Sequence, residues 1–316
     1  MASASGQGLA RRLVSPLFSL LIIGLCILFV RKLDWGSVRS TLAESRLDLV
    51  LAAALVNMIH LFFRAWRWQL LLAPLGQVRV WSLFRYTLGG AAASNLLPGR
   101  VGEALRLLFL RSHGIAVAES FGVLFVEKVL EAASILLLLL PLPLLMPLPS
   151  VATHTIAGLA GICTVLGFLV ALSHKYPMNG NSWFARVAQG VGSLRSRHRM
   201  LRALGLSLAA WICDGLTAVL ILAAVGLPAN PGYALLALLF VNIAIAVPST
   251  PAQIGAFEAG CAFALGLVGI KTEVAVAFGL IYHMVQVLPV TLAGLEPLIR
   301  ARHLLRGRAE VAEASH

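Results

Sequence analysis

Two pairs of ionisable residues at helical spacing stand out in an otherwise apolar sequence. Arg64 and Arg67 are three residues apart, so they would share one face of a helix. Glu127 and Glu131 are four apart and would do the same, with Lys128 between them in the sequence. A charged side chain in the middle of a bilayer costs roughly 2.5–3.5 kcal/mol on insertion scales, so these groups need partners or a hydrated cavity.

These pairs have two interpretations. Guanidinium groups bind phosphates through paired hydrogen bonds, so Arg64 and Arg67, together with Lys128, would clamp an anionic headgroup. Glu127 and Glu131 would then balance the charge or couple protons. The alternative is structural: the arginines are interfacial anchors, and the glutamates belong to the solvated first turn of a span.

A helix break is predicted further along the chain. Pro98 and Gly99 would end one helix, and Gly102 would follow at the start of the next. Backbone groups freed by such a break are tolerated at membrane depth only where they line a cavity or pack against protein. The break therefore predicts a polar site inside the membrane.

Polar side chains flank this break. We interpret Asn95, Arg100 and Arg106 as headgroup ligands, because a helix that restarts after the break directs its positive end towards an anion. Glu103 would balance their charge. The alternative is a static ion group of Arg100, Glu103 and Arg106 that binds no ligand.

A second break resembles the first. Pro248, Pro251 and Gly255 interrupt an apolar stretch, and the pattern P-x-[R/Q]-[V/I]-G followed by a glutamate occurs at both breaks. Glu258 is that glutamate in the second break, and apolar residues follow it. His283 lies inside a later apolar run. We interpret Glu258 and His283 as charge-balancing or coupling groups.

The composition explains why these charges matter. Hydrophobic residues form 59% of the 316 positions and charged residues 12%, whereas soluble domains average about 45–50% and about 25%. The apolar runs are continuous rather than alternating, which excludes a β-barrel. The net charge of +12 lies in loops beside apolar runs, which favours membrane headgroups over nucleic acid as the partner. The cysteines are far apart and form no motif, so neither a metal nor a cofactor is expected.

The elements that must position the charges are membrane helices. The sequence predicts an all-α polytopic membrane protein with about six full spans, near residues 15–30, 47–63, 119–140, 151–172, 203–226 and 274–296. Two broken or re-entrant hairpins are predicted over 80–111 and 232–270. Because the two breaks match and each half has three full spans, we predict inverted pseudo-repeats over 1–146 and 151–296 within a single domain of residues 1–300.

The loop charges predict an orientation. The loop from residue 174 to 202 and the tail over 301–316, which is basic and then polar, are rich in arginine. Both would be cytoplasmic by the positive-inside rule, which places both termini in the cytoplasm and the protein in the plasma (inner) membrane. The loop over 31–46 departs from the rule, since it carries four basic residues on the predicted outer side.

Four motifs occur in order along the chain: Arg64-x-x-Arg67-Trp68, Asn95-x-x-Pro98-x-Arg100-x-Gly102-Glu103-x-x-Arg106, Glu127-Lys128-x-x-Glu131 and Pro251-x-x-x-Gly255-x-x-Glu258. This ordered set resembles the membrane region of lysylphosphatidylglycerol synthetases, a flippase-like family. The resemblance implies movement of lipids between leaflets, in the synthetases of an aminoacylated phosphatidylglycerol. Stand-alone relatives are associated with polyprenol-linked sugars, hopanoid lipids or glycosyltransferase partners.

Three features set this chain apart from the family pattern. Relatives often have Tyr-Arg where this chain has Tyr282-His283, which implies a lost or pH-dependent cationic contact. Glycines are usual where this chain has Ala252-Gln253. The chain ends about 20 residues after the last predicted span. We therefore expect a stand-alone member without the transferase domain, and no lysyl transfer.

The leading hypothesis is a lipid flippase or transporter, not an enzyme, that moves an anionic phospholipid or a polyprenyl-linked intermediate between leaflets. One alternative is a membrane partner of a glycosyltransferase or lipid-synthesis enzyme that transports nothing itself. A second is an intramembrane lipid-phosphate hydrolase, in which carboxylates and arginines hold Mg²⁺ and a pyrophosphate.

Overall fold

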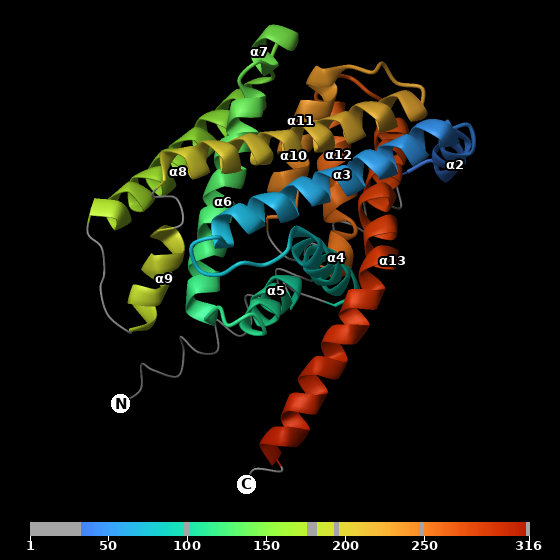
Figure 1. Cartoon of the computed structure of the whole chain (residues 1–316). Helices are drawn as coiled ribbons and strands as arrows, with labels where there is room; N and C mark the ends of the chain where they lie inside the picture. Colours follow the sequence, from blue (N-terminus) through green and yellow to red (C-terminus); the bar gives the residue numbers. More distant parts are fainter. Residues whose placement is uncertain (1–32, 98–100, 176–181, 193–195, 247–249, 314–316) are drawn as a thin grey trace, which may run out of the picture.

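The computed structural model describes residues 33–97, 101–175, 182–192, 196–246 and 250–313, and all its secondary structure in these ranges is helical (Figure 1). The first half contains α2 (Trp35–Ala43), α3 (Leu47–Leu72), α4 (Val80–Leu96), α5 (Val101–Arg111), α6 (Val117–Leu139) and the short α7 (Leu142–Leu145). The second half contains α8 (Ser150–Lys175), α9 (Trp183–Val191), α10 (Arg197–Ala224), α11 (Pro231–Ala244), the 3₁₀ turn η2 (Pro251–Gln253), α12 (Ala256–Gly266) and α13 (Thr272–Glu313).

The chain is a polytopic all-α membrane protein. Within the described residues, four helices are long and apolar enough to cross a membrane: α3, α8, α10 and α13. Leu47, Leu51 and Leu55 recur every four residues on α3, and all three are exposed. Asn57 and Arg67 on the same helix are buried instead. This arrangement places apolar side chains towards lipid and polar ones towards the protein interior.

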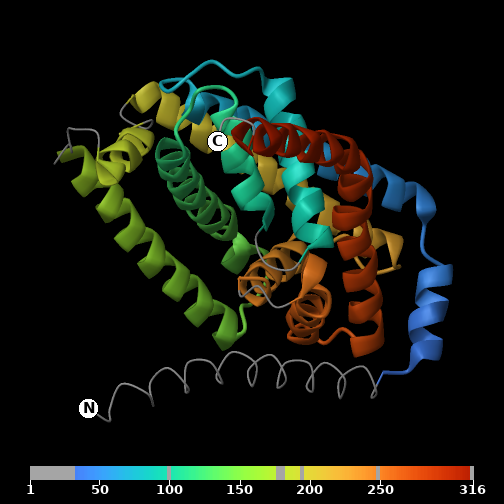
Figure 2. The same cartoon turned by 90° about the horizontal axis from the view of Figure 1, so that it is seen from below.

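The predicted spans coincide with helices wherever the chain is described. The prediction for 119–140 corresponds to α6, which is 23 residues long but carries charged residues in its middle. The first predicted span, 15–30, lies outside the described residues. The predicted tail is helical as far as Glu313, because α13 continues through it. Figures 1 and 2 show that α13 changes direction along its length, and Pro289 and Pro297 each remove a backbone hydrogen bond from it.

Both predicted breaks separate two helices that pack against each other. α4 and α5 form the first hairpin, and α11 and α12 form the second, with η2 between them. Within η2 the backbone of Ala252 and Gln253 is left-handed, with φ of 50° and 63°. Glycine adopts this conformation without strain, whereas other residues adopt it at a cost in energy. Ala252 and Gln253 are therefore strained at the two positions where the resemblance leads one to expect glycine.

Gly102 lies where α4 and α5 touch. A Cβ atom added at this position would overlap the carbonyl oxygen of Gly90 and the hydroxyl of Ser94. That hydroxyl accepts a hydrogen bond from the Gly102 backbone nitrogen at 3.2 Å. Gly102, interpreted from the sequence as part of the break, therefore also permits close packing of the first hairpin.

We expect Gly102→Ala to separate α4 from α5 and to destabilise the protein by about 1–3 kcal/mol or more, the usual range for overpacking. The thermal unfolding of the purified protein in detergent would measure this. Gly161→Ala is the matched control, because a Cβ atom at Gly161 on α8 would meet open space. Equal unfolding midpoints for the two variants would contradict the close contact.

The two halves of the chain are packed into each other. α3 of the first half lies along α10 of the second, and α4 lies along α13. A Cβ atom at Gly294 would overlap the carbonyl oxygen of Leu88, so the α4 and α13 backbones are in close contact. Asn95 Nδ2 donates to Thr291 Oγ1 at 2.9 Å on the same interface. The first hairpin is thereby held against the last helix.

Candidate functional site

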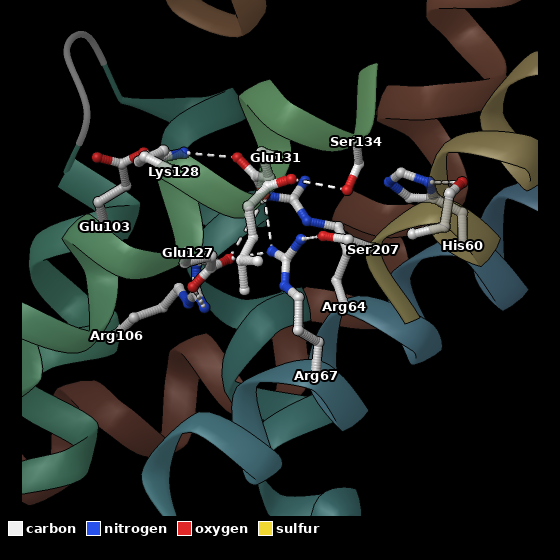
Figure 3. A network of polar contacts seen from close by, with 12 residues as sticks. His60, Arg64, Arg67, Glu103, Arg106, Glu127, Lys128, Glu131, Ser134 and Ser207 are labelled. Carbon is white, nitrogen blue, oxygen red and sulfur yellow. Dashed lines mark hydrogen bonds and ion pairs between the residues drawn. The ribbon is translucent and has the colours of Figure 1, made fainter. Parts of the chain in front are cut away.

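Glu127 on α6 is the centre of a buried ion network (Figure 3). Its Oε1 accepts a hydrogen bond from Nη2 of Arg67 at 2.9 Å, and its Oε2 accepts one from Nη2 of Arg106 at 2.9 Å. The Glu127 and Arg67 side chains are 0% and 1% exposed. One carboxylate therefore joins α3, α5 and α6, and both arginines need it because a buried charge is stable only when it is paired.

Glu131, one turn further along α6, extends the network. Its Oε1 accepts hydrogen bonds from Arg64 at 2.6 Å and from Arg67 at 2.8 Å. Its Oε2 lies 3.3 Å from Nζ of Lys128. Arg67 thus contacts both glutamates, which confirms that Glu127 and Glu131 share a helix face.

Glu103 at the start of α5 pairs across to α6, since its Oε1 lies 3.2 Å from Nζ of Lys128. Among the described residues the network comprises the cations Arg64, Arg67, Arg106 and Lys128 and the carboxylates of Glu103, Glu127 and Glu131. Counted on these seven described side chains alone, the network has one cation more than it has carboxylates.

The exposed fraction of the cationic side chains increases from Arg106 to Arg64 and Lys128. Arg106 is nearly buried, and its guanidinium carbon lies 4.1 Å from the ring centroid of Trp68, which is a cation–π distance. The Arg64 and Lys128 side chains are 29% and 40% exposed. The network therefore has a sealed end at Arg106 and an accessible end at Arg64 and Lys128.

The accessible end opens into a cavity of about 600 Å³. Arg64, Lys128 and Asn95 line it on the side of the first hairpin, and Gln253 and His283 line it on the side of the second. The wall of this cavity therefore combines polar and charged residues from many elements, namely α3, α4, α5, α6, α10, α11, η2 and α13. A cavity of this kind inside a membrane protein can hold a hydrated headgroup while the acyl chains stay in lipid.

The second hairpin contributes its own polar pair. His283 Nδ1 lies 2.7 Å from Glu258 Oε1, and His283 Nε2 lies 2.8 Å from the carbonyl oxygen of Ala252. The other carboxylate oxygen of Glu258 accepts a hydrogen bond from the Gly255 backbone nitrogen at 2.7 Å. Phe257 stacks on the His283 ring with centroids 4.4 Å apart. His283 lines the cavity, and Glu258 lies behind it.

Several polar residues of the cavity wall were not among the site residues predicted from the sequence. Asp214 on α10 accepts hydrogen bonds from the Tyr282 hydroxyl at 2.7 Å and from Gln286 at 3.0 Å. His60 Nδ1 on α3 contacts the carbonyl oxygen of Ala210 at 2.8 Å. A signal was present on α3, where Asn57, His60, Arg64 and Arg67 follow a three-to-four residue spacing within an apolar run.

The structure brings together most of the predicted site residues. Those that line the cavity are Arg64, Arg67, Asn95, Glu103, Lys128, Glu131 and His283. Arg106 and Glu127 lie behind this wall in the ion network. In the described part of the chain Arg106 pairs with Glu127 and Glu103 pairs with Lys128, while the alternative of a static group that includes Arg100 stays a prediction. Pro98, Gly99, Arg100 and Pro248 lie outside the described residues.

Within the described residues, no group of three or more His, Cys, Asp or Glu side chains is placed to hold a metal ion. The carboxylates of the network are held by arginines and a lysine instead.

Comparison with known proteins identifies the family. The family described as the lysylphosphatidylglycerol synthase TM region matches residues 16–294. No curated protein is significantly similar to this chain. Because the match covers most of the chain, including both hairpins and the ion network, the protein belongs to the lysylphosphatidylglycerol synthase TM region family. It is therefore a multi-pass membrane protein of a family concerned with lipid metabolism.

Proposed function

We propose that this protein moves an anionic phospholipid, or a polyprenyl-linked intermediate with a phosphate group, between the leaflets of the membrane. The observation that supports this function is the cavity between the two broken hairpins, whose wall includes the partly exposed cationic side chains of Arg64 and Lys128. Family membership supports a role in lipid handling. In this proposal the protein transports its substrate and does not convert it chemically.

The exposure of the cations suggests separate roles for them. Arg64 and Lys128 would contact the phosphate, because both line the cavity and keep exposed surface. Arg106 would act indirectly: it holds Glu127, which in turn orients Arg67. Asn95 would have a weaker role at the rim, since its amide nitrogen already donates to Thr291. The glutamates would weaken the binding of the anionic substrate enough for it to be released.

The orientation is part of the same proposal. The basic loop over 174–202 supports a cytoplasmic location for that loop and for both termini in a plasma (inner) membrane. A substrate made in the cytoplasmic leaflet would then enter the cavity from that side. The inverted repeat predicted from the sequence would give the cavity an equivalent opening to the other leaflet.

Transport in liposomes tests the proposal. We expect the reconstituted protein to move fluorescently labelled phosphatidylglycerol between leaflets faster than labelled phosphatidylcholine, because only the former has a net negative charge. Loss of fluorescence to a membrane-impermeant quencher added outside would give the rate for each lipid. Labelled polyprenyl phosphate would test the second substrate class in the same assay.

Protein-free vesicles and vesicles containing an unrelated membrane protein are the controls for leakage. Rates equal to these controls for every anionic lipid would refute transport. Such a result would favour the alternative in which the protein assists a glycosyltransferase or lipid-synthesis enzyme.

A further inference from the structure

His283 is placed between two hydrogen-bond acceptors that belong to different parts of the second hairpin. Its Nε2 faces the carbonyl oxygen of Ala252 in η2, and its Nδ1 faces a carboxylate oxygen of Glu258 in α12. A carbonyl oxygen can only accept, so the Ala252 contact requires a proton on Nε2. The contact with Glu258 requires a second proton, either on Nδ1 or on the carboxyl group.

The pair therefore needs two protons to keep both contacts. A neutral imidazole and an ionised carboxylate hold only one proton between them, whichever ring nitrogen carries it. In that state one contact places two lone pairs against each other at 2.7 or 2.8 Å, and it must open. Loss of one proton to the cavity water thus breaks the link from α13 to either η2 or α12.

The segment that this link holds, from Ala252 to Gly255, has a strained backbone, and relief of that strain favours movement when the link opens. Ala252 and Gln253 adopt left-handed φ values, and Gly255 has a φ of 90°. Non-glycine residues held in such conformations persist only when surrounding contacts fix them. Ala252 and Gln253 also line the cavity, so a movement here alters its wall.

Other titratable and charged groups lie on the elements around this pair. Of the elements packed near it, α10 contributes Asp214, which is bound by Tyr282 and Gln286 of α13. α12 contributes Cys261, which is buried one turn from Glu258.

The rest of the cavity wall carries further polar and charged groups. α3 contributes His60 and Arg64, and α6 contributes Lys128 and Glu131. α4 contributes the neutral Asn95, and α5 Glu103. The Glu258 and His283 side chains are 12% and 8% exposed, which leaves them a route to cavity water.

We propose that His283 and Glu258 form a proton-binding site that holds the second hairpin closed against α13 while it carries two protons, and releases it when one proton leaves. Lower pH favours the state with two protons and higher pH the state with one, so the hairpin is closed in the former and open in the latter. The proton site and the release of the hairpin do not depend on the proposed function. A pH dependence of lipid movement is their consequence and rests on the proposed function.

Glu258→Gln separates this site from a merely structural pair. The amide oxygen of the substituted side chain would still accept from the Gly255 backbone nitrogen, and its amide nitrogen would donate to Nδ1 of a neutral imidazole. Nε2 would keep its proton for Ala252. The variant therefore keeps both contacts without a second proton, and we expect its hairpin to stay closed at low and at high pH.

Hydrogen–deuterium exchange of the protein in lipid nanodiscs, at about pH 6 and about pH 8, measures the release. After correction for the intrinsic pH dependence of exchange, we expect residues 250–258 of the wild type to exchange at least severalfold faster at the higher pH. Glu258→Gln should show equal corrected rates at both values. His198→Gln, which removes an exposed histidine of α10, should retain the wild-type difference.

A wild type without a pH difference, or a Glu258→Gln variant that keeps it, would overturn the proposal. If Glu258→Gln does not fold, His283→Arg serves instead, because a permanent cation supplies donors to both acceptors and should also give equal rates. Lipid transport measured in parallel separates the two claims. A pH-dependent exchange without any lipid movement refutes transport alone, and lipid movement with pH-independent exchange refutes the proton site alone.

Discussion

Replacement of Glu127 by glutamine is expected to destabilise the protein by about 3–5 kcal/mol, the cost of removing one partner from a buried ion pair. The substitution keeps the size of the side chain and one acceptor oxygen, but it removes the charge that Arg67 and Arg106 share. Arg106 would then keep the face of Trp68 as its remaining described cation contact. We expect poor recovery in detergent and a much lower unfolding midpoint.

Glu296→Gln is the matched control for this experiment. Glu296 on α13 also pairs with two arginines, Arg85 and Arg300, but its side chain is 49% exposed. Exposed pairs contribute about 0–1 kcal/mol, so its loss should change the midpoint little. If the two variants unfold at the same temperature, the network around Glu127 does not hold α3, α5 and α6 together.

The combined substitution of Arg64 and Lys128 by glutamine is expected to lower the transport of anionic lipid by at least roughly tenfold. A hydrogen bond to a charged group contributes about 1.5–3 kcal/mol, and about 1.4 kcal/mol corresponds to a factor of ten. Both side chains line the cavity, so both losses fall on the substrate. The initial rate for labelled phosphatidylglycerol in liposomes measures the effect.

The control for this variant removes the same two charges elsewhere. Arg111 and Lys271 are exposed at helix ends, and their combined replacement by glutamine should leave the rate within about twofold of the wild type. The unfolding midpoint of the Arg64/Lys128 variant must stay close to the wild type, since Glu131 keeps Arg67 as a partner. An unchanged rate in a folded Arg64/Lys128 variant would remove these residues from the headgroup site.

The sequence predicted the elements of this fold well because local chemistry determines them. Apolar runs of sufficient length become membrane helices, and proline and glycine interrupt them, as α4–α5 and α11–α12 show. The face shared by Glu127 and Glu131 also followed from helical spacing. These inferences require no knowledge of what lies on neighbouring helices.

The pairing of charges could not be predicted in the same way. Arg106 lies three residues from Glu103, and spacing gave no sign that Arg106 contacts Glu127 on another helix. Spacing alone cannot show which helices pack together. For the same reason the family resemblance indicated that His283 stands where an arginine is usual, but nothing in the sequence indicated the two acceptors that surround it.

The packing of α3 along α10 and of α4 along α13 has a consequence for how such a protein can be made. Each half hides its polar and glycine-lined surfaces against the other, so a half synthesised alone would expose them to lipid. We therefore expect either half produced alone to fold poorly, and two separately translated halves in the same membrane to assemble with each other.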